Sequence, residues 1–333
     1  MTSVIDRLGS PAATGLPGPP ASPRIPRKRR RRIAAAAMVA PTVAGLLVFY
    51  AYPLVASIYY SFTSYDLFSP PRWVGLTNYE FLFTSDPRIG NAALNTLWFV
   101  VVLVPIKIVV ALAIAGLLAR RTRGSGFWRT VFYLPSLVPP VAGVVAFVFL
   151  FNPGSGPVNV VLGFFGIEGP LWFSDPALSK PSLVLLGIWM MGDLMVIMLA
   201  GLLDVPRELY EAASLDGANG WQQVRFVTLP TIQPILGFSV VTGVIAALQY
   251  FTEAAVASSV ASGQASVGSG TASTLGYPGD SLLTYTQWLY ARGFSNYQLG
   301  YASAMAVVLF VTASILLVVA MRRISAFQPE EVS

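Results

Sequence analysis

The chain has 333 residues, of which 55% are hydrophobic and only 11% are charged, and its mean hydropathy is +0.65. Soluble domains carry about a quarter charged residues, so this composition predicts an integral membrane protein. The formal net charge is +6. The chain has no cysteine, which excludes disulfides and thiol catalysis, and no histidine, which removes the usual zinc ligand and general base. These absences argue against redox or hydrolytic enzymes and against a catalytic or metal site.

The first 32 residues are rich in proline and glycine and end in an unbroken run of six cations at 27–32. Their lack of apolar periodicity predicts a disordered, basic cytosolic tail. A nucleic-acid-binding patch or an export signal are alternative interpretations of such a run. We favour a topogenic anchor and expect no nucleic-acid partner, because five more apolar segments follow and no small-residue cleavage site closes the first. Residues 324–333 are expected to form a second cytosolic tail.

Six apolar segments have about the length that a helix needs to cross 30 Å of hydrocarbon. They comprise residues 33–52, 95–118, 131–151, 182–203, 234–251 and 301–319. Basic clusters precede the first segment, separate the second from the third, and follow the sixth. Because an even number of spans puts both termini on one side, the positive-inside bias places that side in the cytoplasm. We therefore predict an all-α integral membrane fold with six transmembrane helices over residues 33–323.

Two charged residues lie at similar depth within these segments, Lys107 in the second and Asp193 in the fourth. Each costs about 2.5–3.5 kcal/mol at mid-bilayer. Two interpretations are open. In the first, the two side chains form an ion pair that fixes the packing of the second and fourth helices. In the second, Asp193 faces a translocation path and binds hydroxyl groups or an amine of a substrate. Further path candidates are Trp189, Gln249, Tyr250 and Glu253, and an interfacial aromatic belt is the alternative for Trp189 and Tyr250.

The loop between the fourth and fifth segments, residues 204–230, contains "EAASLDGANGWQQVRFVTLP" and would lie in the cytoplasm. Asp204 is a candidate N-cap for a first helix, which Gly217 would end in the left-handed conformation. Asp216 or Asn219 would start a second helix, and Pro230 would end it. The polar faces lack the excess of lysine and arginine expected for lipid contact, so a docking surface for a soluble partner fits better.

This loop resembles the EAA loop of ABC importer permeases, whose pattern is Glu-Ala-Ala, three residues, Gly, nine residues, a branched aliphatic residue, one residue and Leu-Pro. The matching residues are Glu211, Ala212, Ala213, Gly217, Val227, Leu229 and Pro230, with every spacing intact. Flanking stretches such as "LAGLLDVPRELY" and "FWRTVFYLPSLVPPV" are similar to the carbohydrate branch, the maltose and glycerol-phosphate permeases. The similarity covers roughly residues 37–323, and the stretch after the fifth segment departs from it.

The resemblance implies a type I importer bundle whose cytoplasmic coupling helix sits in a cleft of a separate ATP-binding subunit. In that role Glu211 would contact a basic residue of the partner, Ala212 and Ala213 would permit close approach, and Gly217 would supply the bend. Asp216, Leu229 and Pro230 complete the expected coupling set. The resemblance also implies a second six-span permease, with a heterodimer expected, together with two ATP-binding subunits, an extracytoplasmic solute-binding protein and membrane lipid.

The chain has no phosphate-binding loop, because none of its lysines follows a glycine. ATP and magnesium would therefore be used by the partner ATPase, and this chain would bind no cofactor. We predict binding-protein-dependent import of a sugar or sugar-like solute across the bacterial cell membrane. An ion-coupled secondary carrier or a channel is the alternative, although it leaves the cytoplasmic loop unexplained. The long outer loop, 252–298, has a small-residue half expected to be flexible and an aromatic half expected to form a short interfacial helix that meets the binding protein.

Overall fold

The computed structural model describes residues 27–120, 124–263 and 274–325, and their regular secondary structure is helical apart from one short strand pair. The chain divides into two compact units, Met1–Val55 and Ala56–Ser333. The first unit holds helix α1 (Arg27–Leu46) and a π-helical turn, η1 (Leu47–Ala51). The basic run 27–32 is therefore helical, not part of a disordered tail, because arginine and lysine are good helix formers that extend the apolar helix behind them. Residues 1–26 lie outside the described part.

Helix α2 (Tyr52–Ser61) leads from the first unit into the second. There the strands β1 (Thr63–Ser64) and β2 (Arg72–Trp73) pair antiparallel. The next elements are α3 (Thr77–Thr84), α4 (Ile89–Trp98), η2 (Phe99–Leu103), α5 (Val104–Ala119), α6 (Ser125–Tyr133), η3 (Leu134–Leu137), α7 (Pro140–Leu150) and α8 (Pro157–Phe164).

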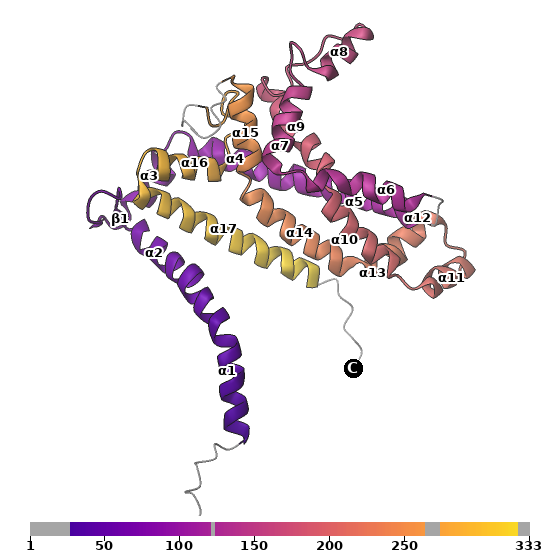
Figure 1. Cartoon of the computed structure of the whole chain (residues 1–333), viewed down its shortest axis with the longest axis horizontal. Helices are drawn as coiled ribbons and strands as arrows, with labels where there is room; N and C mark the ends of the chain where they lie inside the picture. Colours follow the sequence, from indigo (N-terminus) through magenta and orange to yellow (C-terminus); the bar gives the residue numbers. More distant parts are fainter. Residues whose placement is uncertain (1–26, 121–123, 264–273, 326–333) are drawn as a thin grey trace, which may run out of the picture. The chain divides into compact units, whose positions relative to one another are not determined.

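The second half of the chain adds eleven labelled elements, most of which can be found in Figure 1. They are α9 (Pro176–Trp189), α10 (Gly192–Leu203), α11 (Arg207–Leu215), α12 (Gly220–Gln223), η4 (Val224–Thr228), α13 (Leu229–Thr231), α14 (Gln233–Leu248), α15 (Thr252–Ala261), α16 (Tyr285–Tyr290), η5 (Ala291–Ser295) and α17 (Leu299–Ser325).

Three helical runs in the described part are long and apolar enough to cross a membrane: Ala35–Ser61, Ile89–Ala119 and Leu299–Arg322. Three further candidates are bent pairs: Ser125–Leu137 with α7 at 99°, α9 with α10 at 50°, and Gly220–Thr231 with α14 at 69°. Counting each pair as one span gives the six that the sequence predicts. Residues 131–151 are nevertheless not one helix, because Pro139 lies in an extended conformation and a new helix starts at Pro140.

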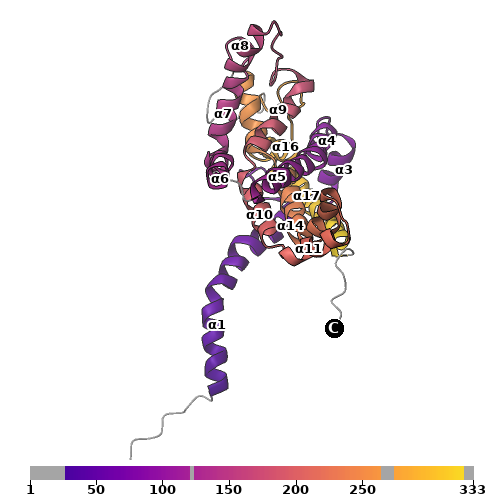
Figure 2. The same ribbon diagram turned by 90° about the vertical axis from the view of Figure 1, so that its right-hand side faces the viewer.

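Helices α5, α10 and α14 pack against one another and form the part of the bundle that carries the candidate site (Figures 1 and 2). The α5–α10 contact buries Ala111 and Ala115 with Met195 and Met198. Small residues on one helix let the backbones approach closely, as is common between membrane helices. Gly201 has the same effect between α10 and α14, because a Cβ built there would lie only 2.1 Å from an Ile235 methyl group.

Candidate functional site

The loop with the EAA pattern begins with helix α11, which ends as the sequence predicts. Gly217 has φ +78°, a left-handed conformation that suits glycine. The Ala218 N–H donates to the Ala213 carbonyl at 2.9 Å and the Gly217 N–H donates to the Ser214 carbonyl at 3.1 Å. These two bonds are the Schellman arrangement, which satisfies the last carbonyls of the helix and reverses the chain.

The second helix of the loop starts at Asn219, one of the two predicted caps. The Asn219 side chain accepts from the Gln222 N–H at 2.9 Å, and the Gln222 side chain accepts from the Asn219 N–H at 2.7 Å, which makes a capping box. The prediction of Asp204 as the cap of the first helix is wrong. Asp204 ends α10, and Pro206, whose extended ψ directs the chain into the helix, occupies the position before α11.

The helical run that follows extends beyond the predicted end at Pro230. It continues to Thr231, and the bend into α14 comes at Ile232. A π-helical turn precedes the proline, with the Leu229 N–H donating to the Val224 carbonyl. Pro230 then follows as the second residue of the short helix α13, just before the bend.

Side-chain hydrogen bonds join the two halves of the loop into one structural unit. The hydroxyls of Tyr210 on α11 and Thr228 on η4 lie 2.9 Å apart. The Gln223 amide donates to the Ser214 hydroxyl at 2.9 Å. Because these bonds cross between the helices, α11 is held to the run that joins α14.

The outer face of this loop presents most of the predicted coupling residues. Glu211, Ala212, Asp216, Gly217 and Pro230 are exposed, whereas Ala213 and Leu229 are half-buried. Two large apolar side chains stand among them, with Leu215 90% exposed and Trp221 71% exposed. Exposed apolar side chains with polar neighbours, outside the spans predicted from the sequence, are typical of an interaction surface.

A cavity of about 570 Å³ lies among α5, α10, α14 and the residues that follow α14. It brings together five residues predicted from sequence for the substrate path or the ion pair: Lys107, Asp193, Gln249, Tyr250 and Glu253. Trp189, the remaining candidate, does not line this cavity. It ends α9 ahead of the bend, and its ring packs against Phe147 with a centroid distance of 5.3 Å.

The charges in this cavity do not form the simple pair that the sequence allowed. Asp193 accepts a hydrogen bond from the Ser136 hydroxyl at 3.1 Å. Among the described residues no ion pair joins Lys107 to Asp193, and Glu253 lines the same cavity. The cavity lining therefore contains one cation and two carboxylates.

A polar cluster around Asp86, beside the first residues of two candidate spans, was not predicted from the sequence. Buried Asp86, just before α4, accepts hydrogen bonds from Trp288 Nε1 at 2.9 Å, Tyr301 Oη at 2.6 Å and Arg292 Nη2 at 3.2 Å. Burial by itself raises the pKa of the Asp86 carboxyl, but the hydrogen bonds from Tyr301, Trp288 and the Arg88 N–H, together with the Arg292 charge, bring the pKa below its ordinary value. This cluster connects α4 with α16, η5 and α17.

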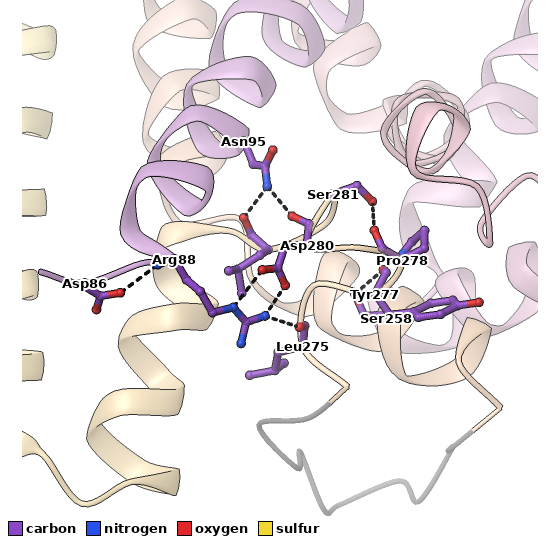
Figure 3. Close-up of polar contacts among 10 residues, drawn as sticks. Asp86, Arg88, Asn95, Ser258, Leu275, Tyr277, Pro278, Asp280 and Ser281 are labelled. Carbon is purple, nitrogen blue, oxygen red and sulfur yellow. Dashed lines mark hydrogen bonds and ion pairs between the residues drawn. The ribbon is translucent and has the colours of Figure 1, made fainter.

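A second set of contacts fixes the segment that departs from the carbohydrate-branch pattern (Figure 3). Arg88 forms an ion pair with Asp280, with its Nε donating to Oδ2 at 3.0 Å. The Asn95 amide donates to the carbonyls of Asp280 at 2.7 Å and Leu283 at 2.9 Å. Residues 274–284 are thus held against α4. The first part of the small-residue stretch forms helix α15, so the prediction of a flexible segment is wrong for Thr252–Ala261. Residues 264–273 lie outside the described part.

The predicted aromatic helix of the outer loop is present as α16 and η5, but its first turns are packed inside the protein. Tyr285, Gln287 and Trp288 are buried, whereas Phe294 and Tyr297 remain exposed. For the polar cluster around Asp86, the only signal in the sequence was the presence of charged residues in the loops. Its hydrogen-bonding partners are about 200 positions apart in the sequence.

Residues 107–327 match the family model described as "Binding-protein-dependent transport system inner membrane component". The probable ABC transporter permease protein YesP of Bacillus subtilis (strain 168) is 37% identical over 86% of this chain and 89% of its own length. The sulfoquinovosyl glycerol transport system permease protein SmoG of Agrobacterium fabrum is 31% identical over 84% of this chain and 86% of its own length.

A solved structure of a bacterial alginate ABC transporter, in complex with an alginate pentasaccharide-bound periplasmic protein, shares the fold with a TM-score of 0.71. It is 20% identical and covers 88% of this chain and 94% of the matched one. These matches confirm the predicted importer-permease fold and the expectation that the chain is a transport component and not itself an enzyme. The chain belongs to the family of inner membrane components of binding-protein-dependent transport systems.

Proposed function

We propose that this chain is the permease subunit of an ATP-driven importer for a sugar or sugar-like solute, with the cavity as part of the solute path and the loop 204–230 as the contact with the ATPase. One observation carries the proposal. Helix α14 lines the cavity with Phe238, Ser239 and Thr242, and its other end is joined directly to the loop at Ile232. A displacement of the loop therefore reaches the cavity through a single helix.

The packing around this junction supports transmission of force. Ile232 is buried, and the close approach of Gly201 to Ile235 locks α10 to α14 just beyond it. Close-packed interiors transmit strain because they deform little. The loop, α10 and α14 would then move together when an ATPase closes, and ATP and magnesium would be bound by that partner.

The chemistry of the cavity suits a solute rich in hydroxyl groups. Carboxylates of Asp193 and Glu253 accept hydrogen bonds, the Gln249 amide both donates and accepts, and Lys107 donates. Pockets that bind small polar solutes combine an apolar wall with a few such groups. The Agrobacterium relative is named for a sulfoquinovosyl glycerol, and the solved structure has an alginate pentasaccharide on its periplasmic protein, which supports a carbohydrate class.

The remaining partners follow from the same proposal. A second six-span permease completes the pore, with two ATP-binding subunits on the cytoplasmic side and an extracytoplasmic solute-binding protein on the other. Both chain termini lie in the cytoplasm. The basic residues next to the first and last spans support this orientation.

Reconstitution tests the coupling half of the proposal. The chain would be purified with its partner permease, ATPase and binding protein, placed in liposomes, and assayed for ATP-dependent uptake of labelled sugars. Glu211→Lys reverses a charge on the exposed face of α11 and should reduce uptake and ATPase co-purification by about tenfold or more, as expected for a lost charge-assisted contact. Glu208→Lys makes the same change on the same helix outside the matched pattern and should retain most activity.

Two results would contradict the proposal. Uptake by the chain alone, driven by an ion gradient without an ATPase, would support a secondary carrier. Equal loss in the two glutamate variants would remove the evidence for a specific ATPase contact. For the solute path, Glu253→Gln should raise the KM for transport, whereas Trp189→Leu, outside the cavity, should leave it unchanged.

A further inference from the structure

A second cavity of about 570 Å³ lies between the loop and the helix ends that face it. One wall comes from the C-terminal ends of α5 and α10, and the other comes from α11, α12 and η4. The lining residues are Gly116, Ala119, Arg120, Leu202, Leu203, Val205, Arg207, Tyr210, Gly220, Gln223, Val224 and Thr228. The cavity is thus apolar where it meets the spans and polar where it meets the loop.

The cavity lining is strongly cationic. Arg120 and Arg207 both contribute to it, and no aspartate or glutamate does. Within the part of the chain that the structure describes, neither arginine takes part in an ion pair. Arg120 ends α5, where a cation is favoured by the helix dipole, but Arg207 opens α11, where a cation is disfavoured. The helix dipole therefore accounts for Arg120 but not for Arg207.

The cavity also has room for an anion. A Cβ built on Gly116 or on Gly220 would meet no atom within 4 Å, so both walls are open at these points. The hydroxyls of Tyr210 and Thr228 line the polar wall, but they share one hydrogen bond and Thr228 Oγ1 also donates to the Gln223 carbonyl at 3.3 Å, so the two arginines are the donors for an anion. Arginine is well suited to phosphate because its planar fork binds two oxygens at once.

We infer that this cavity binds the phosphate group of an acidic phospholipid of the cytoplasmic leaflet. The apolar wall, formed by Ala119, Leu202 and Leu203 at the ends of two spans, favours a lipid over free phosphate because it can hold the start of the acyl region. Basic pockets at the cytoplasmic ends of membrane helices bind acidic headgroups in this way. The inference rests on the proposed orientation, which places the loop in the cytoplasm, and it adds a lipid contact to the ATPase-coupling loop.

Native mass spectrometry of the whole transporter tests this inference without depending on transport. The complex would be delipidated in neutral detergent and titrated with phosphatidylglycerol, with phosphatidylcholine as the uncharged comparison. Arg120→Gln and Arg207→Gln should each weaken the first phosphatidylglycerol site by about ten- to a hundredfold, the loss expected for a charged hydrogen bond. Arg225→Gln, the same change on the same loop outside the cavity, should leave it unchanged.

A variant that keeps every charge separates binding in the cavity from general attraction to the surface. Gly116→Leu fills the apolar wall, where the structure has space, and should weaken phosphatidylglycerol binding while the complex keeps its full subunit mass. The inference fails if phosphatidylglycerol binds Gly116→Leu and both arginine variants as tightly as the parent. It also fails if Arg225→Gln loses as much affinity as the cavity variants, or if inorganic phosphate displaces the lipid at comparable concentration, which would assign the site to a free anion.

Discussion

Replacing Asp86 by asparagine should destabilise the end of the bundle around α4 and α16 more than the same replacement at an exposed aspartate. The Asp86 side chain is 0% exposed and that of its partner Arg292 is 14% exposed. Asp86→Asn would leave a buried guanidinium without its counter-charge, a change that costs about 3–5 kcal/mol when one member of a buried pair is removed. The Arg292 cation also lies over the rings of Trp288, Phe81 and Tyr301, which would retain part of the stabilisation. We therefore expect about 3 kcal/mol, the lower end of that range.

The chain provides a matched control in the second ion pair of the same region. Asp280 and Arg88 have side chains that are 30% and 28% exposed, so water screens their attraction. Asp280→Asn should cost about 1 kcal/mol or less. The backbone at Asp280 has φ +61°, a left-handed conformation that asparagine tolerates well, so the substitution adds no strain. The two variants differ mainly in the burial of the charge that is lost.

Thermal unfolding of the purified complex measures the difference. Two kcal/mol between the variants corresponds to roughly 4–8 °C in Tm, from about 2–4 °C per kcal/mol for domains of 150–250 residues. Because the pKa of Asp86 is below its ordinary value of 3.8, its stabilisation is fully present above that pH and is lost as the pH falls through the folded-state pKa. The Tm of the Asp86→Asn variant should therefore fall less than that of the parent as the pH is lowered below that value. An equal Tm for both variants would refute the argument from burial.

The remaining predictions concern the loop and the cavity. Gly217→Val should reduce coupled ATPase activity and Gly217→Asn should retain most of it, because the left-handed backbone costs about 1–2 kcal/mol for most residues and less for asparagine; equal activities would contradict this reading. Gly243→Ala should lower Tm through overpacking, about 1–3 kcal/mol, because its new Cβ would lie 2.8 Å from Val104, and Val104→Ala in the same chain should restore it. Lys107→Met should impair folding or transport, and Glu253→Gln added to it should recover more function than either change alone predicts, measured by a double-mutant cycle.

The loop with the EAA pattern was largely predictable because its signals are local. Gly217 ends one helix and Asn219 starts the next through hydrogen bonds within five positions. The fourth span shows the opposite case. Its break at residues 190–191 contains no proline, and its packing depends on Gly192, where a Cβ would lie 2.8 Å from the Phe132 carbonyl oxygen and from Tyr133 Cα. A contact between residues about 60 positions apart leaves no periodic trace in the sequence.

The break between α9 and α10 changes the local environment of Asp193, one of the charged residues that line the cavity. Asp193 does not lie in the middle of a continuous helix but in the first turn of α10, where the N-terminal end of the helix dipole favours a carboxylate. With this field and the hydrogen bond from Ser136, Asp193 does not require Lys107 as a direct partner. Among the described residues Lys107 forms no ion pair with either cavity carboxylate, so the Asp193 carboxylate has hydrogen-bonding capacity left for a solute. For this reason we propose Asp193 as a group facing the path and not as half of a structural ion pair, and Asp193→Asn should then reduce transport while the complex still assembles.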